Sequence, residues 1–179
     1  MHLGRTTLSK FLIQQLQDVE DQGKLAALLV DVAAAVKAIS AMTAKGALGG
    51  MAADAQSGGY LGAVENTNVQ GEQQKKLDVL ANDAMVTATE WGGLVAGLAS
   101  EELDAPYVIP ENFARGPYLL IFDPLDGSSN TDVNVSVGTI FSVLQHSGTE
   151  PPAISDYLQP GTRQVAAGYA IYGRPPCWC

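Results

Sequence analysis

Two aspartates and a group of small residues stand together where the sequence reads Asp-Pro-Leu-Asp-Gly-Ser-Ser-Asn, at positions 123–130. Asp123 and Asp126 can place two carboxylates around one hard cation such as Mg²⁺. The small residues that follow, Gly127–Ser129, offer hydroxyl and backbone N–H groups to an anion. A cation site beside an anion site suits phosphoryl transfer. An ordinary Asp-Pro/Asp-Gly turn after a strand is the other interpretation of the same residues.

Two apolar segments would bring carboxylates to one place. Residues 118–122 form a short continuous apolar run, which is typical of a buried strand. We expect Pro124 to end this strand, because proline cannot donate to a sheet ladder. Residues 94–99 form a second apolar run that leads into Glu101 and Glu102. Because open sheets build sites where neighbouring strands end, the two segments predict a carboxylate cluster at one sheet edge.

Asp78 is a further acidic candidate, within a helix predicted over residues 72–91. Apolar residues follow helical spacing there, while Asp78, Asn82 and Asp83 lie on the other faces. A solvated helix face is the simpler interpretation of these three residues. If the helix and the strand ends meet, a divalent cation would neutralise the clustered carboxylates, and oxygen ligands favour Mg²⁺ or Mn²⁺. A remaining carboxylate, Glu102 or Asp78, could then take a proton from the attacking water.

The remaining sequence predicts an α/β or α+β protein with helices layered on a sheet. Residues 6–20 and 24–43 carry apolar side chains at helical spacing and are expected to be packing helices. Residues 133–144 and 165–172 are predicted strands. Seven glycines punctuate residues 46–71, which predicts either a mobile lid over a site or a disordered linker.

Composition narrows the class of protein. The 179 residues are 46% hydrophobic and 16% charged, which is a globular composition. The net charge of −9 argues against nucleic-acid binding. Asp31 and Lys37 interrupt the longest apolar segment, so we expect no membrane span. The first residues lack the apolar region of a secretory signal, so we expect a cytoplasmic protein. Cys177 and Cys179 alone are too few ligands for a zinc site.

Several segments resemble the amino-terminal half of class I fructose-1,6-bisphosphatases, within the wider family of metal-dependent, lithium-sensitive sugar and inositol phosphatases. Residues 123–130 are similar to that family's D-P-L-D-G-S-S-N, whose shorter core D-P-x-D-G-[ST] is shared with inositol monophosphatases. Narrower motifs of fructose bisphosphatases are similar to residues 75–83 (KKLDVLAND), 136–141 (SVGTIF) and 165–173 (VAAGYAIYG). The match spans nearly the entire chain to Gly173.

The resemblance implies a role for each matching residue. The residues that would bind Mg²⁺ are Glu101, Asp123, Asp126 and, through its carbonyl oxygen, Leu125. The residues that would hold the substrate 1-phosphate are Asp126, Gly127, Ser128 and Ser129. Asp78 and Glu102 would activate water. The glycine-rich residues 46–76 would be a mobile loop, with Asn68 and Glu72 entering the site when it closes.

The implied reaction is the hydrolysis of fructose 1,6-bisphosphate to fructose 6-phosphate and phosphate, in gluconeogenesis or Calvin-type carbohydrate metabolism. The implied fold is the layered mixed-sheet fold of sugar phosphatases, and the implied assembly is a homotetramer. An inositol monophosphatase-like enzyme is the nearest alternative. A catalytically inert fragment that only binds metal or associates with full-length subunits is the alternative from another class.

This chain is shorter than the members of the family that it resembles, which are roughly twice as long. We therefore expect residues 1–179 to be the amino-terminal metal- and phosphate-binding domain, with the carboxy-terminal domain missing. The last residues, Pro-Cys-Trp-Cys at 176–179, do not continue the family pattern. A reading frame shifted by one base would produce them, so residues 174–179 are expected to be an aberrant tail.

Overall fold

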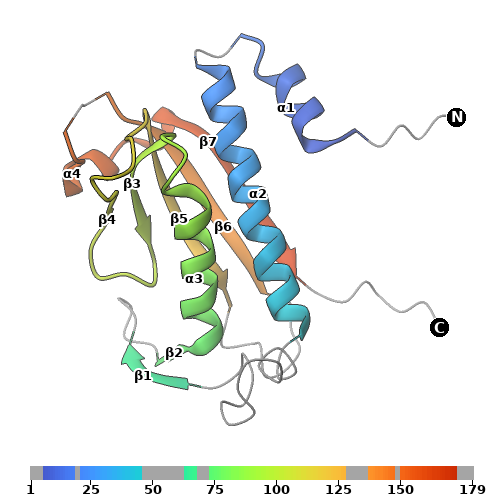
Figure 1. The fold of residues 1–179 in the computed structure, drawn as a ribbon, viewed down its shortest axis with the longest axis vertical. Helices are drawn as coiled ribbons and strands as arrows, with labels where there is room; N and C mark the ends of the chain where they lie inside the picture. Colours follow the sequence, from blue (N-terminus) through green and yellow to red (C-terminus); the bar gives the residue numbers. More distant parts are fainter. Residues whose placement is uncertain are drawn as a thin grey trace, which may run out of the picture.

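A five-stranded mixed sheet forms the centre of the protein, in the order β4-β3-β5-β6-β7 (Figure 1). The computed structural model describes residues 6–18, 21–45, 63–67, 73–127, 137–147 and 150–172. The strands are β3 (Val95–Ser100), β4 (Tyr107–Val108), β5 (Tyr118–Asp126), β6 (Val137–Gln145) and β7 (Gln164–Tyr172). β3 and β5 are parallel, whereas the other neighbouring pairs are antiparallel. The predicted mixed α+β architecture is therefore confirmed.

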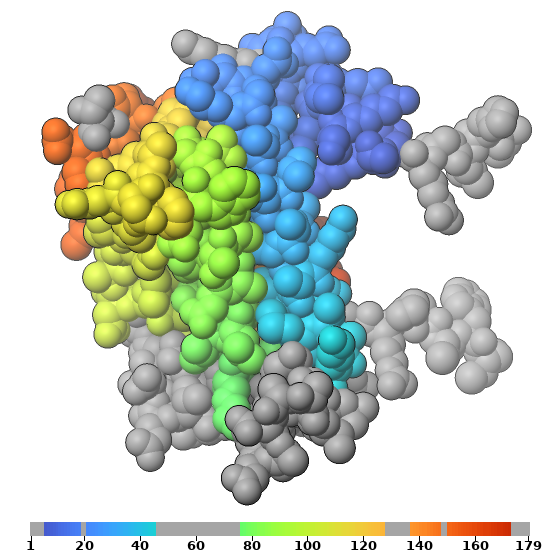
Figure 2. All heavy atoms as spheres, viewed as in Figure 1, coloured from blue at the N-terminus to red at the C-terminus, as the bar shows by residue number. Residues whose placement is uncertain are grey.

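Helices α2 (Gln22–Lys45) and α3 (Lys76–Thr89) lie side by side over one face of this sheet (Figures 1 and 2). Leu28 and Val32 of α2, Met85 of α3 and Leu120 of β5 belong to the buried cluster between the two layers. The shorter helix α1 (Leu8–Gln15) packs on α2, and Thr7 caps it by accepting a hydrogen bond from the Lys10 backbone N–H at 3.2 Å. The predicted packing helices are therefore present.

Helix α2 is long and apolar enough to cross a membrane by length and composition alone. Our sequence-based expectation that no segment reaches this length is wrong on that criterion. The core helix of a globular protein passes the same test. Leu25, Leu28, Val32 and Ile39 are buried against the neighbouring helix and sheet, so we interpret α2 as a core helix.

Strand β5 runs past the proline that we expected to end it. It includes Pro124 and extends to Asp126, and its pairing with β6 is irregular between Asp123 and Asp126. At this irregularity the Thr139 hydroxyl donates a hydrogen bond to the Pro124 carbonyl oxygen, over 2.8 Å. Proline is tolerated at such a position because its nitrogen is not needed as a ladder donor.

Short elements account for the other differences from the predicted fold. Helix α3 begins at Lys76 instead of residue 72, because β2 (Gln73–Lys75) precedes it and pairs antiparallel with β1 (Ala63–Thr67). Strand β4 and helix α4 (Ile154–Tyr157) lie outside the predicted helices and strands. Each of these elements has two to five residues, too few for a periodic pattern. The remaining glycine-rich residues, 46–62 and 68–72, and the tail 174–179 lie outside the described residues.

Candidate active site

The parallel strands β3 and β5 lie side by side; Glu101 and Glu102 follow the end of β3, and Asp123 and Asp126 lie in the last part of β5. Ser100 pairs with Phe122 across the two strands. The Glu101 backbone N–H donates to the Phe122 carbonyl oxygen at 3.1 Å, and Asp123 comes next in β5. The strand ends therefore meet as predicted, and they hold Glu101 and Asp123 at one edge of the sheet.

Asp123 lies where burial and negative charge oppose its ionisation. Burial is the main reason that the pKa of its carboxyl group rises from 3.8 to about 6. The Leu125 backbone N–H donates to Asp123 Oδ1 at 3.0 Å and lowers the pKa, while the charges of Glu101, Asp126 and Asp78 raise it. Three carboxylates thus act electrostatically on Asp123, one from α3, one from the turn after β3 and one from β5 itself.

Asp78 and Glu102 are buried beside this edge. Asp78 lies in the first turn of α3 and is 2% exposed, and Glu102 is 9% exposed. The prediction that these residues lie on a solvated helix face is therefore wrong for Asp78 and Asn82. Asp83 is exposed, as that prediction requires. The reason is that α3 packs against the sheet and turns this side of its first two turns inward. The helix dipole favours an acidic residue in this first turn.

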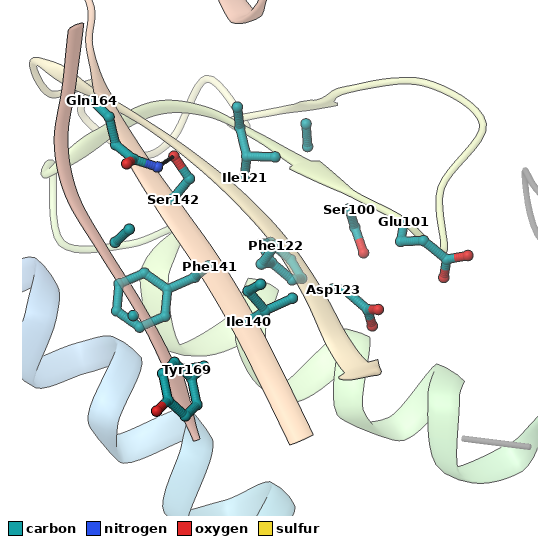
Figure 3. A pocket seen from close by; sticks show the side chains of 13 residues that line it. Ser100, Glu101, Ile121, Phe122, Asp123, Ile140, Phe141, Ser142, Gln164 and Tyr169 are labelled. Atoms are coloured by element: carbon teal, nitrogen blue, oxygen red, sulfur yellow. Dashed lines mark hydrogen bonds between the residues drawn. The ribbon is translucent and has the colours of Figure 1, made fainter. Parts of the chain in front are cut away.

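A hollow of about 910 Å³ adjoins the carboxylates on the sheet face that α2 and α3 do not cover. Figure 3 shows the Glu101 and Asp123 carboxylates and the Ser100 hydroxyl toward the same end of this hollow. At the other end, the Gln164 side-chain amide donates to Ser142 Oγ at 2.7 Å. The acidic edge is therefore open to a ligand from this side within the described part of the chain.

The predicted phosphate-binding turn is described in part. Asp126 is exposed, and Gly127 has a φ of +78°, a conformation that favours glycine. The side chain of Leu125 between the two aspartates is buried. The other predicted contributors lie outside the described residues: Ser128, Ser129, Asn68 and Glu72. Their roles stay predictions.

Our sequence-based predictions did not include two residues that support the site. Ser100 Oγ accepts a hydrogen bond from the Glu102 backbone N–H at 3.3 Å and so holds the turn after β3. Thr139 is 1% exposed and bonds to Pro124 inside the irregular part of β5. The signal for Thr139 was available, since it is a polar residue inside the apolar run Val-Gly-Thr-Ile-Phe.

The donor set is compatible with a hard divalent cation. Among the described residues, no three Asp, Glu, His or Cys side chains converge closely enough to hold one ion by themselves. Mg²⁺ does not require such a cage, because it commonly uses one or two carboxylates together with water and substrate phosphate. Glu101 and Asp123 supply oxygen donors, and the raised pKa of Asp123 marks negative charge that a cation would neutralise.

Comparison with known proteins agrees with this geometry. The family profile described as "Fructose-1-6-bisphosphatase, N-terminal domain" matches residues 6–177. The holo crystal structure of Leishmania major fructose-1,6-bisphosphatase is similar, with a TM-score of 0.78 and 34% identity over 94% of this chain and 49% of that one. For the apo structure the TM-score is 0.67 and the identity 31%, over 94% and 47% of the two chains. The chain thus spans about half the length of these relatives. With its α+β fold, acidic sheet edge and matching profile, the chain belongs to the fructose-1,6-bisphosphatase family.

Proposed function

We propose that this chain forms the metal- and phosphate-binding half of an enzyme that hydrolyses fructose 1,6-bisphosphate to fructose 6-phosphate and phosphate. The observation that carries the proposal is the meeting of Glu101 and Asp123 at two parallel strand ends, within the electrostatic reach of Asp78 and Asp126. Family membership supports the substrate, because the similar solved structures are fructose-1,6-bisphosphatases.

Each acidic residue has a proposed role. Glu101, Asp123 and Asp126, with the Leu125 carbonyl oxygen, would hold Mg²⁺ or Mn²⁺. A cation bound there would polarise a phosphoryl oxygen and increase the acidity of a bound water molecule. Asp78 and Glu102 are buried beside these ligands, so a proton that they take from the attacking water is held away from solvent.

The turn after β5 would bind the phosphate group that is removed. Gly127, directly after Asp126, has a positive φ, which is typical of a tight turn. Successive N–H groups in such a turn can converge on one anion. We place the 1-phosphate on this turn, with Ser128 and Ser129 as further donors and with Asn68 and Glu72 approaching when the ligand is bound.

Phosphate release from fructose 1,6-bisphosphate in the presence of Mg²⁺ tests this function. We expect turnover by the purified chain, and we expect Asp123→Asn to lower it by on the order of 100-fold or more, the size of a typical single-group contribution. Asp18→Asn is the matched control, because Asp18 is exposed after α1, away from the sheet edge.

The same assay separates the alternatives. A folded wild-type chain without turnover would mean that this chain is an inert fragment. Turnover with inositol monophosphate in preference to the bisphosphate would assign it to the inositol phosphatase branch. Equal turnover by the wild type and Asp123→Asn would show that the proposed site does not carry out the reaction.

A further inference from the structure

Asn82 is a buried polar residue on the inner side of helix α3. It is 7% exposed, and Ala81 and Met85 beside it in the helix belong to the buried apolar cluster. Its side-chain oxygen, Oδ1, is buried and has no hydrogen-bond partner among the described residues. A buried acceptor without a donor costs free energy, so this atom is expected to have a partner when the protein functions.

Asn82 lies one helical turn after Asp78. Side chains four residues apart lie on the same side of a helix, with Cβ atoms about 5–6 Å from each other. Asp78 is 2% exposed, and its charge acts on Asp123 at the acidic edge. Further along the same side of α3, the Thr89 hydroxyl donates to the Met85 carbonyl oxygen at 2.8 Å. Asn82 is therefore the polar group of α3 that follows Asp78 inward from the acidic edge.

The chemistry of Oδ1 limits what can bind to it. An amide oxygen accepts hydrogen bonds and cannot donate one, so its partner must carry an O–H or N–H group. Mg²⁺ usually keeps several of its water molecules when a protein binds it. Water molecules around a divalent cation are more acidic and therefore stronger donors than free water. Such a water molecule, held at the acidic edge, is a suitable donor to Oδ1.

We propose that Asn82 is a positioning residue of the cation site, whose Oδ1 accepts a hydrogen bond from a water molecule in the hydration shell of the cation, beside Asp78. The inference rests on the proposed function, because it requires a cation at Glu101 and Asp123. An amide oxygen can hold this water without adding another negative charge to an edge where carboxylates already act on Asp123. Asn82 thus orients the water relative to Asp78 without contacting the cation.

A purely structural role for Asn82 predicts a different result. If its amide held α3 on the sheet, replacing it would destabilise the protein with or without a cation. In the proposed role, Oδ1 has its partner only when a cation is bound. An apolar side chain of similar size should then be tolerated in the metal-free protein, because it removes a buried acceptor that has no donor.

Asn82→Leu tests the proposal by Mn²⁺ binding, followed by electron paramagnetic resonance at about neutral pH. We expect this variant to bind Mn²⁺ at least about tenfold more weakly than the wild type, the usual effect of losing a group that supports the metal ligands. Its thermal unfolding temperature in a chelator should be equal to or higher than that of the wild type. Asn82→Asp keeps an oxygen acceptor at the same distance from the backbone, so it should bind Mn²⁺ at least as tightly as the wild type.

Asn112→Leu is the matched control, because Asn112 is exposed in the segment between β4 and β5. It should bind Mn²⁺ like the wild type. Asp123→Asn is measured in the same series and shows whether the cation site itself is present. The readouts are binding and thermal stability, so the experiment does not need turnover by this chain.

Three results would overturn the proposal. If Asp123→Asn loses Mn²⁺ binding and Asn82→Leu does not, the cation site stands and Asn82 has no part in it. A clearly lower unfolding temperature of Asn82→Leu in a chelator, or equally weak binding by Asn82→Leu and Asn82→Asp, would assign Asn82 a structural role. A wild type that binds no Mn²⁺ would remove the cation site together with the role of Asn82.

Discussion

Asp123 combines burial with a hydrogen bond from the Leu125 N–H and with the negative charges of neighbouring carboxylates. The Leu125 N–H fixes one carboxylate oxygen, while Glu101, Asp126 and Asp78 oppose the negative charge. A carboxylate in this environment takes up a proton more readily than usual, unless a bound cation neutralises its negative charge. The electrostatics of this residue therefore link metal binding, pH and folding stability.

The metal-free protein should lose stability through Asp123 as pH rises. The pKa of this group is about 6 in the folded protein and near 3.8 when unperturbed, so between these values the folded state holds more of the proton. The free energy of unfolding then falls with rising pH across this window. Thermal unfolding in a chelator, compared between the wild type and Asp123→Asn, measures this contribution.

We expect the stability of the wild type relative to Asp123→Asn to decrease between about pH 4 and about pH 6 and to level off above. The difference between the two proteins cancels the contributions of acids that do not interact with Asp123. A relative stability that increases with pH over this window would contradict the assigned environment of Asp123.

The acidic residues at the strand ends could be predicted from the sequence, and the burial of Asp78 could not. Glu101 and Asp123 each follow a short apolar run, so a parallel pairing of the runs was enough to bring them together. Asp78 and Asn82 lie at helical spacing among other polar residues, where exposure is the ordinary outcome. Only the packing of α3 on the sheet decides that they face inward.

At the scale of elements, Thr139 joins three strands at the turn that carries the acidic residues. Its hydroxyl donates to the Pro124 carbonyl of β5 and is also hydrogen-bonded to the Tyr172 hydroxyl of β7. Because a threonine has one hydroxyl proton and Pro124 accepts it, Tyr172 must donate to Thr139. β6 thus holds the irregular end of β5 through one buried side chain.

Thr139→Val should destabilise the protein by about 1–3 kcal/mol, because it leaves the Pro124 carbonyl and the Tyr172 hydroxyl buried without this partner. Thr139→Ser keeps the hydroxyl and should recover most of the loss. Chemical denaturation measures both variants. A valine variant as stable as the wild type would show that the hydroxyl does not support the turn.

A second contact joins α3 to the edge strand β4. The Tyr107 hydroxyl donates to the Glu90 carboxylate just after α3, and this hydrogen bond is the main cause that raises the pKa of Tyr107 to about 12. Tyr107→Phe should therefore cost about 0.5–1.5 kcal/mol of unfolding free energy. In a spectroscopic pH titration, the variant should also lack a tyrosine that ionises at a higher pH than an ordinary tyrosine. An unchanged titration curve would contradict the contact.

The long elements of the fold could be predicted and the short ones could not. Helices α2 and α3 and strand β7 carry enough apolar positions to show their period. Strand β4 has two residues and helix α4 has four, so their existence depends on pairing and packing with distant segments. Where β5 continues through Pro124, it is hydrogen-bonded to Thr139, which lies 15 residues later in the chain.

At the scale of the whole molecule, one layer of helices covers one face of a mixed sheet, and the acidic edge opens beside the other face. The chain matches one domain of a longer family, and its open apolar face adjoins the same edge. The homotetramer and the metabolic pathway implied by the family resemblance stay predictions, and so does the cytoplasmic location expected from the first residues.

The acidic edge is proposed as a cation site, and Mn²⁺ binding followed by electron paramagnetic resonance tests this without needing turnover. At about neutral pH, where carboxylates such as Asp123 are ionised, the chain should bind Mn²⁺ and release it to excess Mg²⁺. Asp123→Asn should weaken this binding at least about tenfold, while Asp18→Asn should bind like the wild type. Equal Mn²⁺ binding by the wild type and Asp123→Asn would contradict the account.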